Sequence, residues 1–380
     1  MFVYIAICTL LTIFYAVIMA LYHRYWVLTS TLNTSKDFPQ KSVSVIIPVR
    51  NESENIALLL EDLLAQDYPQ ALLEIIVVDD FSDDNTATLV KQFPREKVKL
   101  IALKDFIFQN EIIHAYKKKA LEVGIQQAQN EIILTTDGDC RVHKDWVKTM
   151  MMYQSISNSK LLTGAVIMNH TDTLFEKFQA LDFLGMMGIT AAMLKMKIFN
   201  MANGANLLYE KKGFEEVKGF EGINQVASGD DMLLIYKFAL QYNQSVGFAK
   251  HPSAVVYTST EKSLRGFLRQ RFRWTAKSKD YQDKRMTFIL GLVFLFVCTL
   301  VFNFFGLFFS KTLCLLFFIQ LVVKSVSDYR LLKSTSSYYH REDLMKSFWS
   351  SQFFHILYIV VVGSLGNLLN FEWKGRKQRK

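Results

Sequence analysis

Several features that define common protein classes are scarce in this 380-residue chain. Only four cysteines are present, and no CxxC pair or zinc-ligand spacing occurs, so the sequence supports neither a disulfide framework nor a structural zinc site. Charged residues make up 21% of the chain against 51% hydrophobic residues. That balance is too apolar for an ordinary soluble protein and too charged for a pure transporter. The charge is also unevenly placed, so the composition indicates membrane segments around a soluble domain. No internal repeat or low-complexity linker is present.

The first apolar run also lacks the marks of a signal peptide. Residues 1–22 contain no charged side chain, no Lys or Arg precedes them, and no small-residue cleavage site follows. A helix of this length can span a bilayer. Arg24, Lys36 and Lys41 follow the run, so the positive-inside rule predicts an N-terminus outside and a soluble domain in the cytoplasm. The charge pattern and compact size favour a bacterial cytoplasmic (inner) membrane.

Three further apolar runs lie near the C-terminus, at residues 286–310, 312–323 and 347–371. The middle run is short and spans a membrane only if Lys324, which follows it, snorkels toward the interface. Four crossings would place the basic C-terminal tail outside, against the positive-inside rule. The sequence therefore leaves three or four crossings open, with one segment re-entrant or interfacial in the first case.

The net charge of +9 is concentrated in two stretches. Residues 262–285 contain nine Lys or Arg against two acids, and residues 374–380 contain five more. Basic stretches beside apolar runs are typical of contact with anionic lipid headgroups. Nucleic acid is the competing partner, but no nucleic-acid-binding motif accompanies the charge, so we expect no nucleic-acid partner.

The middle of the chain alternates strand-like and helix-like stretches, which predicts an α/β domain with a mainly parallel sheet. Short runs rich in Val and Ile predict strands, and helical patterns lie between them. The expected strands are residues 43–49, 74–80, 98–103 and 131–137, and the expected helices are residues 54–66, 85–93 and 117–129.

Acidic residues gather at the predicted carboxyl ends of these strands, where open α/β sheets bind ligands. Asp80 ends the second strand, and Asp137 and Asp139 follow the fourth around Gly138. Acids at one sheet edge repel one another unless a cation compensates them, and hard oxygen ligands favour Mg²⁺ or Mn²⁺. The alternative is local structure, because Asp-Gly is a common turn dipeptide and "SDDNT" (82–86) can begin a helix with acids in its first turn.

Five motifs in order resemble family 2 glycosyltransferases of the GT-A fold, over about residues 42–275. They are "VSVIIPVRNESENI", "IIVVDDFSDDNT", "TTDGD", "ASGDDMLL" and "QRFRW". The membrane layout is similar to the branch that includes polysaccharide synthases and the enzymes that glycosylate lipids or carotenoids. The resemblance implies a nucleotide-sugar donor, with a UDP-sugar expected, and a divalent metal.

The resemblance also implies which residues bind the donor. They are Pro48, Glu52, Asp80, Lys117 and Asp137 in the α/β domain. Asp80 is expected at the base, Asp137 near the ribose, and Asp139 on the metal that bridges the diphosphate. Lys117 matches the lysine of a "GKxxAL" element, although Tyr116 replaces its usual glycine. Cys140, beside the two acids, is expected to be a packing residue.

For the acceptor side, the resemblance points to the acid pair Asp230 and Asp231. The second acid is the expected general base, and Asp230 is the neighbouring acid that would raise its pKa toward the working pH. The alternative is a helix N-terminus with acids in its first turn, although capping needs only one of them. Asn203, Gly204 and Asn206 match a segment that passes beside the donor sugar and the acceptor.

Gln270, Arg273 and Trp274 match the family's QxxRW pattern. In the family the arginine helps to neutralise the diphosphate and the tryptophan stacks at the acceptor site. Apolar residues alternate with arginines here, which is also typical of an amphipathic helix at a membrane interface. Both interpretations can hold together.

Together these observations predict an inverting, membrane-bound hexosyltransferase that acts on a lipid or glycan acceptor at the cytoplasmic face. The expected organisation is a membrane anchor (1–25), a GT-A catalytic domain (40–260), an interfacial segment (261–285), C-terminal membrane segments (286–371) and a basic tail (372–380). Two alternatives remain: a processive polysaccharide synthase, and a catalytically silent membrane scaffold.

Overall fold

The computed structural model describes residues 1–32, 38–108, 111–170, 173–198, 201–226, 229–243, 245–276, 281, 283–366, 371–373 and 376–378. The chain divides into two compact units. The helical unit comprises Met1–Thr29, His170–Phe199 and Thr260–Phe371, and the sheet unit comprises Ser30–Asn169, Asn200–Ser259 and Glu372–Lys380. Lys36 and part of the expected basic tail lie outside the described residues.

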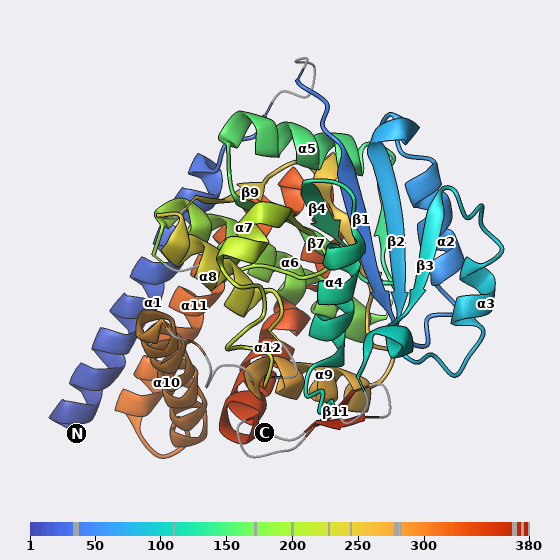
Figure 1. Ribbon diagram of the computed structural model, residues 1–380. Helices are drawn as coiled ribbons and strands as arrows, with labels where there is room; N and C mark the ends of the chain where they lie inside the picture. Colours follow the sequence, from blue (N-terminus) through green and yellow to red (C-terminus); the bar gives the residue numbers. More distant parts are fainter. Residues whose placement is uncertain are drawn as a thin grey trace. The chain divides into compact units, whose positions relative to one another are not determined.

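The sheet unit is built on a seven-stranded, mainly parallel sheet with the order β3-β2-β1-β4-β8-β6-β9 (Figure 1). β8 is antiparallel to both of its neighbours, and β9 is parallel to β6. The strands are β1 (Val43–Val49), β2 (Leu73–Asp79), β3 (Val98–Ala102), β4 (Ile132–Thr135), β6 (Leu161–Gly164), β8 (Leu207–Glu210) and β9 (Val246–Ala249). A second sheet has the order β5-β10-β7, with β5 (Arg141–Val142), β7 (Val166–Asn169) and β10 (Val256–Ser259).

Crossover helices connect the parallel strands, as the alternating pattern predicts. They and the other helices of this unit are α2 (Ile56–Leu64), α3 (Thr86–Val90), α4 (Tyr116–Gln127), α5 (Trp146–Ser157), α7 (Lys211–Glu216) and α8 (Met232–Gln241), with short 3₁₀ turns η1 (Gln70–Leu72), η2 (Leu103–Phe106) and η3 (Pro252–Ala254). α4 packs on β1 and β2 (Figure 1). A Cβ at Gly124 would lie 2.5 Å from Ile46 Cγ2, so glycine lets this helix approach the sheet. All four expected strands and all three expected helices are confirmed within a few residues.

The core of the sheet unit consists of the apolar strand residues and the helices on both faces. Every residue of β4 is buried, as are six of the seven residues of β1. Such continuous apolar runs are typical of strands covered on both faces. Lys250, directly after β9, is only 5% exposed, and its carbonyl accepts a hydrogen bond from the Tyr153 hydroxyl. Burial lowers the pKa of Lys250 to about 8.

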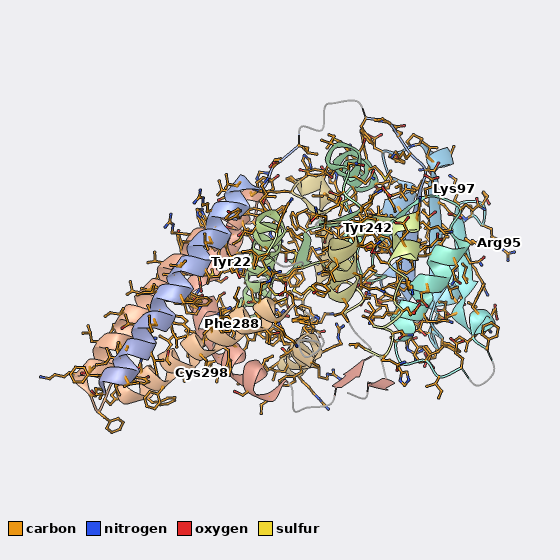
Figure 2. All side chains as sticks on the ribbon, turned by 60° about the vertical axis from the view of Figure 1, so that its left-hand side comes forward. Tyr22, Arg95, Lys97, Tyr242, Phe288 and Cys298 are labelled. Carbon is orange, nitrogen blue, oxygen red and sulfur yellow. The ribbon has the colours of Figure 1, made fainter. Side chains whose placement is uncertain are left out.

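The helical unit contains α1 (Phe2–Leu28), α6 (Leu174–Met196), α9 (Leu264–Ala276), α10 (Lys284–Gly306), α11 (Lys311–Tyr338), η5 (Glu342–Ser347) and α12 (Phe348–Leu365). Among the described residues, four helical segments are long and apolar enough to cross a membrane: Phe2–Leu28, Lys284–Gly306, Lys311–Tyr338 and Glu342–Leu365. Figure 2 labels Tyr22 on α1, which is buried, and Phe288 on α10, which is 66% exposed. Exposed apolar side chains on such helices suit contact with lipid.

Lys324 does not snorkel toward the interface, which was the condition for the third apolar run to span a membrane. Its side chain is fully buried, and its ammonium donates to Asp328 at 2.6 Å, to Gln352 at 2.7 Å and to His355 at 3.2 Å. A buried lysine needs such partners because an unpaired ammonium is costly away from water. With this charge satisfied inside the unit, α11 continues for 28 residues instead of ending near Val323.

The expected catalytic range of residues 40–260 is interrupted by a segment of the helical unit. Residues 170–199, which contain α6, belong to that unit because α6 packs on α1, α11 and α12. Fourteen of its 23 residues are buried. A helix that is apolar on most of its surface lies in a core or in a membrane.

The C-terminal residues Phe371–Trp373 (β11) and Arg376–Gln378 (β12) pair as a two-stranded ribbon.

Candidate active site

The predicted donor-site residues of the sheet unit gather at one edge of the large sheet. β2, β1 and β4 are adjacent and parallel, so their carboxyl ends lie side by side. The backbone N–H of Asp80 donates to the carbonyl of Val49, and that of Thr136 donates to the carbonyl of Ile46. The acids after these strands therefore emerge at a common edge, as the sequence predicts.

Hydrogen bonds join the loops after β1 and β2. The guanidinium of Arg50 donates to the carbonyls of Asp80 and Phe81 at 2.9 and 2.7 Å. Asp84 accepts from the Thr86 hydroxyl at 2.5 Å, from the Thr86 backbone N–H at 2.9 Å and from the Ser53 backbone N–H at 3.0 Å. Partial burial raises the pKa of its carboxyl, but these bonds outweigh that effect and lower the pKa to about 2. Asp84 thus has a structural role that joins two loops, but it precedes α3 and does not lie in its first turn, where the local interpretation placed the acids.

The three residues expected to line the nucleotide pocket differ in exposure. Asp80 is 2% exposed and Glu52 is 9% exposed, whereas Pro48 is half-buried. The backbone N–H of Glu52 donates to Thr86 Oγ1 at 2.8 Å. Nearby, Phe81 packs edge-on against Tyr116, the residue that replaces the family's glycine, with ring centroids 6.0 Å apart. The roles of Pro48, Glu52 and Asp80 in binding a nucleotide stay predictions.

Close packing determines the conformation of the Asp-Gly-Asp segment. A Cβ at Gly138 would lie 2.9 Å from Val49 Cγ1 and 3.0 Å from Glu52 Cγ, so only glycine fits here without movement. The segment is thereby held against the end of β1, and Asp137 and Asp139 flank this contact point. Next to them, Cys140 is buried, and burial raises the pKa of its thiol well above the usual range, as suits a packing residue.

The two acids of this segment have different partners. Asp137 lies 2.6 Å from the ammonium of Lys117 on α4. Asp139 is exposed and accepts from the Thr258 hydroxyl at 3.3 Å and from the Cys140 thiol at 3.6 Å. Among the residues that the structure describes, no basic side chain forms an ion pair with Asp139. Asp139 is thus the acid of the pair with a carboxylate accessible to a bound group.

Lys117 connects the end of β4 with the segment before α8. Its Nζ lies 2.6 Å from Asp137 and 3.3 Å from Asp230. Burial lowers the pKa of this ammonium, but the carboxylates of Asp137 and Asp230 outweigh that effect and raise the pKa above its ordinary value. Burial raises the pKa of Asp137, and the Lys117 charge opposes that rise. Lys117 is therefore protonated at neutral pH and compensates two acids.

Asp231 is both the expected general base and the N-cap of α8. Its Oδ1 accepts from the N–H of Met232 at 2.6 Å, and its Oδ2 accepts from the N–H of Gly204 at 3.2 Å. Asp230, the expected neighbouring acid, faces Lys117, so its charge is compensated. A Cβ at Gly204 would lie 2.8 Å from Asp230 Oδ2, which explains the glycine at this position.

The expected acceptor-side segment contacts this acid pair through Gly204. The Thr135 hydroxyl on β4 donates to the Gly204 carbonyl at 3.0 Å. Asn203 folds back on its own loop, accepting from the N–H of Ala205 at 3.1 Å. Asn206 is fully buried, and its amide donates to the carbonyls of Ala165 and Ala254 and accepts from the Trp146 indole. The Asn206 side chain is therefore engaged in positioning this segment.

Sequence reasoning missed Lys118, which follows Lys117. Its side chain is 1% exposed and donates to the carbonyls of Ile223 and Val226, each at 2.6 Å. These carbonyls belong to the loop that leads to Asp230 and Asp231. Three consecutive lysines carry no period that separates a buried residue from its neighbours, so only the fold identifies it.

The QxxRW residues lie in the helical unit, on α9, whereas the other predicted site residues lie in the sheet unit. Gln270, Arg273 and Trp274 are all partly buried. The intervening Arg271, which the pattern leaves unspecified, is 3% exposed and forms an ion pair with Asp182 of α6 at 2.8 Å. Sequence reasoning did not assign a role to either residue of this pair.

The described residues contain no group of three or more His, Cys, Asp or Glu side chains that could hold a metal ion. Asp139 nevertheless offers an exposed carboxylate, which is a hard oxygen donor of the kind that Mg²⁺ and Mn²⁺ prefer. The donor set therefore fits a cation that takes one ligand from the protein and others from a bound diphosphate, but not a cation held by side chains alone.

Curated proteins of known class are similar to this chain. The curated relatives include glycosyltransferase AglE of Haloferax volcanii, 31% identical over 194 residues, which are 50% of this chain and 59% of that protein. They also include the poly-beta-1,6-N-acetyl-D-glucosamine synthase of Staphylococcus epidermidis, 25% identical over 237 residues, which are 62% of this chain and 54% of that protein. The chain thus spans between half and two thirds of the length of these relatives.

A solved structure has the same fold over nearly the whole chain. It is the mannosyltransferase PcManGT from Pyrobaculum calidifontis in complex with GDP-Man and Mn²⁺, with a TM-score of 0.56 and 18% identity, covering 94% of this chain and 98% of that one. This likeness confirms the expected GT-A class of α/β fold, with apolar helices at both ends.

Two family profiles match the chain and together cover both units. Glycosyl transferase family 2 matches residues 44–217, which include the strand ends and the Asp-Gly-Asp segment. Glycosyl transferase family group 2 matches residues 132–365, more than half of the chain, from β4 to the end of α12. With its fold and its ordered motifs, the chain belongs to glycosyl transferase family 2.

Proposed function

We propose that this protein transfers a sugar from a nucleotide sugar, a UDP-sugar, to a hydroxyl group of a lipid or glycan acceptor at a membrane. The observation that carries the proposal is the cluster around Lys117, which lies within 3.3 Å of acids from two segments, Asp137 after β4 and Asp230 before α8. Asp139 and Asp231 flank this cluster in sequence. Family membership and the names of the relatives support the same reaction class.

On the donor side, Pro48, Glu52 and Asp80 hold the nucleotide base at the ends of β1 and β2, and Asp137 lies near the ribose. Lys117 and Arg273 supply positive charge for the diphosphate, and the Gln270 amide of α9 is a neutral donor-binding group. Asp139 would hold Mn²⁺ or Mg²⁺, and the bound cation would stabilise the negative charge that develops on the leaving diphosphate. The Mn²⁺ complex of PcManGT supports this assignment by fold.

On the acceptor side, Asp231 accepts the proton of the attacking hydroxyl. The acceptor oxygen forms a bond to C1 of the sugar as the bond between C1 and the diphosphate oxygen breaks, and the nucleoside diphosphate leaves with that electron pair. Attack from the face opposite the diphosphate inverts the configuration at C1. Gly204, whose N–H donates to Asp231, would keep the carboxylate oriented while Asn203, Asn206 and Trp274 shape the acceptor side.

The acceptor and the location follow from the helical unit. Four helices fit association with a membrane, and the basic residues around α9 suit its anionic, cytoplasmic surface. We place the catalytic unit on the cytoplasmic side of a bacterial inner membrane. An acceptor that is a lipid, or a glycan growing at that surface, meets the enzyme there without leaving the membrane.

A processive polysaccharide synthase is the second candidate, favoured by the 25% identity to poly-beta-1,6-N-acetyl-D-glucosamine synthase. Such a synthase would extend one product repeatedly, whereas a single-transfer enzyme would release it after one sugar. The mass of the product made with a native lipid extract separates the two, because a ladder of sugar additions indicates processive synthesis and one added mass indicates single transfer.

The proposal is tested with detergent-purified protein and a panel of UDP-, GDP- and dTDP-sugars, with and without Mn²⁺. We expect release of UDP that depends on Mn²⁺, and a loss of about a hundredfold or more in Asp139→Ala and Asp231→Ala. Asp67→Asn is the matched control, because Asp67 is an exposed acid that pairs only with Lys148 among the described residues. Full activity of both alanine variants would overturn the mechanism.

A further inference from the structure

Side chains of α6 contact α9, or the segment just before it, at three points. The Gln179 amide donates to the carbonyl of Glu261 at 2.9 Å and accepts from its N–H at 3.0 Å. Asp182 accepts from Arg271 at 2.8 Å, and the ring of Phe183 lies 5.5 Å from that of Trp274. Residues 179, 182 and 183 lie on one face of α6, because residues three and four apart are neighbours on a helix.

Arg271 lies on the inward face of α9, among aromatic rings. Its guanidinium carbon is 4.4 Å from the ring centroid of Trp274, 4.9 Å from that of Phe267 and 5.6 Å from that of Tyr358. The side chain is almost fully buried, and its Nε is buried without a hydrogen-bond partner in the described part of the chain. A buried guanidinium is stable only when a counter-ion compensates it.

Asp182 is that counter-ion, and it is held from a second helix. Its side chain is 5% exposed, and it accepts a hydrogen bond from the Tyr358 hydroxyl of α12 at 3.2 Å in addition to that from Arg271. His355, also on α12, lies 3.7 Å from it. The carboxylate is therefore fixed between α6, α9 and α12, and the orientation of Arg271 is fixed with it.

The inward orientation of Arg271 determines where the neighbouring QxxRW residues point. Successive residues on a helix are separated by about 100°, so Arg273 projects about 200° away from Arg271, on nearly the opposite face. Trp274, three residues from Arg271, returns to the inward face and stacks on it. Rotation of α9 that released Arg271 would therefore turn Arg273 away from its position.

We infer that Asp182 and Arg271, aided by Gln179, are positioning residues that set the rotation of α9 and so fix the faces of this helix from which Gln270 and Arg273 project. This inference rests on the proposed function, in which Gln270 and Arg273 bind the nucleotide sugar. Asp182 and Arg271 do not touch the donor. They act on α9, because the Arg271 guanidinium stays buried only while Asp182 compensates its charge.

The test compares variants of the full chain in detergent by two measurements. Hydrogen exchange of the peptide covering residues 264–276 reports the order of α9 without any ligand, and calorimetry with UDP or GDP and Mn²⁺ reports nucleotide affinity. In Asp182→Asn the guanidinium loses its counter-ion, so we expect faster exchange in α9 and an affinity about tenfold to a hundredfold weaker.

The double variant Asp182→Leu/Arg271→Met shows whether the charge of Arg271 itself contributes to nucleotide affinity or whether Arg271 acts only by holding α9 in position. It contains no buried charge to expel, so we expect exchange and affinity to return to within about threefold of the unmodified chain. Failure of the double variant to recover, or unchanged exchange in Asp182→Asn, would overturn the inference.

Asn303→Leu is the matched control within the helical unit. Asn303 is fully buried on α10 and bonds to Tyr4 and Gln320, away from α9, so we expect lower thermal stability with unchanged nucleotide affinity. An affinity loss in this control equal to that of Asp182→Asn would also contradict the inference. If the unmodified chain bound neither nucleotide, the proposed function and the donor part of the inference would fail, while exchange would still show whether the pair orders α9.

Discussion

The ammonium group of Lys117 lies 2.6 Å from Oδ1 of Asp137, where the first turn of α4 meets the end of β4. The same ammonium reaches Asp230 at 3.3 Å, so one cation compensates acids from two segments far apart in the sequence. Two carboxylates this close together would otherwise repel each other and take up a proton. Lys117 therefore compensates both carboxylates before a donor or a cation binds.

Replacing this lysine tests whether that compensation matters. We expect Lys117→Met to lose about a hundredfold or more in kcat/KM, because it leaves two acids uncompensated and removes a charge from the proposed diphosphate site. Steady-state release of nucleoside diphosphate measures the effect.

Lys119→Met is the control on the same helix. Lys119 pairs with Glu111 at 2.7 Å in a partly exposed ion pair, so we expect its loss to change activity less than about threefold, as surface pairs contribute about 0–1 kcal/mol. Equal losses in both variants would show that the helix, and not the Lys117 charge, is what activity requires.

Asp231 combines two roles that substitution can separate. Asparagine can accept from the Met232 N–H but not also from the Gly204 N–H, and it does not accept a proton, so we expect Asp231→Asn to lose activity while losing less stability than Asp231→Ala. Asp231→Ala should lose activity and also about 1 kcal/mol of stability, because α8 loses its cap. Activity assays and thermal unfolding in detergent together distinguish the roles, and an active Asp231→Asn protein would leave only the capping role.

Gly138 tests how tightly the Asp-Gly-Asp segment is packed. The added methyl of Gly138→Ala would meet Val49 Cγ1 at 2.9 Å, so we expect destabilisation of about 1–3 kcal/mol and a shift of both flanking acids. Gly291→Ala is the contrast, because nothing lies within 4 Å of its added methyl on α10. Thermal unfolding that ranks the two variants the other way would contradict the packing argument.

Burial of Lys250 predicts a pH dependence of stability. Its pKa is about 8 in the folded chain against 10.5 for a free lysine, so between these values the unfolded chain binds more protons than the folded one. Stability should therefore rise with pH from about 8 to 10.5, by at most about 1.4 kcal/mol per pH unit from this group. Thermal midpoints across this range should rise less steeply in Lys250→Met, and identical slopes would show that Lys250 does not titrate there.

Much of the sheet unit follows from the sequence alone. Val- and Ile-rich runs predict β1, β2, β3 and β4, and those of β1 and β4 are buried on both faces. The parallel order of adjacent strands brings the ends of β1, β2 and β4 to one edge. The short spacing of Asp137, Gly138 and Asp139 keeps both acids near that edge. Periodicity and local spacing are properties of neighbouring residues, so they can be read without knowledge of the fold.

Only the tertiary structure determined which partners the charged side chains of the site bind. Lys117 with Asp230, Lys118 with the carbonyls of Ile223 and Val226, and Arg271 with Asp182 all join residues far apart in the chain. The resemblance to a "GKxxAL" element singled out Lys117, but neither it nor periodicity predicts the partners of Lys117 and Lys118, because these depend on what packs against each side chain.

For the membrane helices, too, the sequence predicts the apolar runs and tertiary contacts determine the partners of the charged residues. Hydropathy indicated four apolar runs, but the short third run continues to Tyr338 because Asp328, Gln352 and His355 satisfy the buried ammonium of Lys324. A charge inside an apolar helix is costly unless partners on other helices compensate it. The sequence by itself determined the strands, the apolar runs and the acids at the sheet edge, and only tertiary contacts decided the partners that make those charges stable.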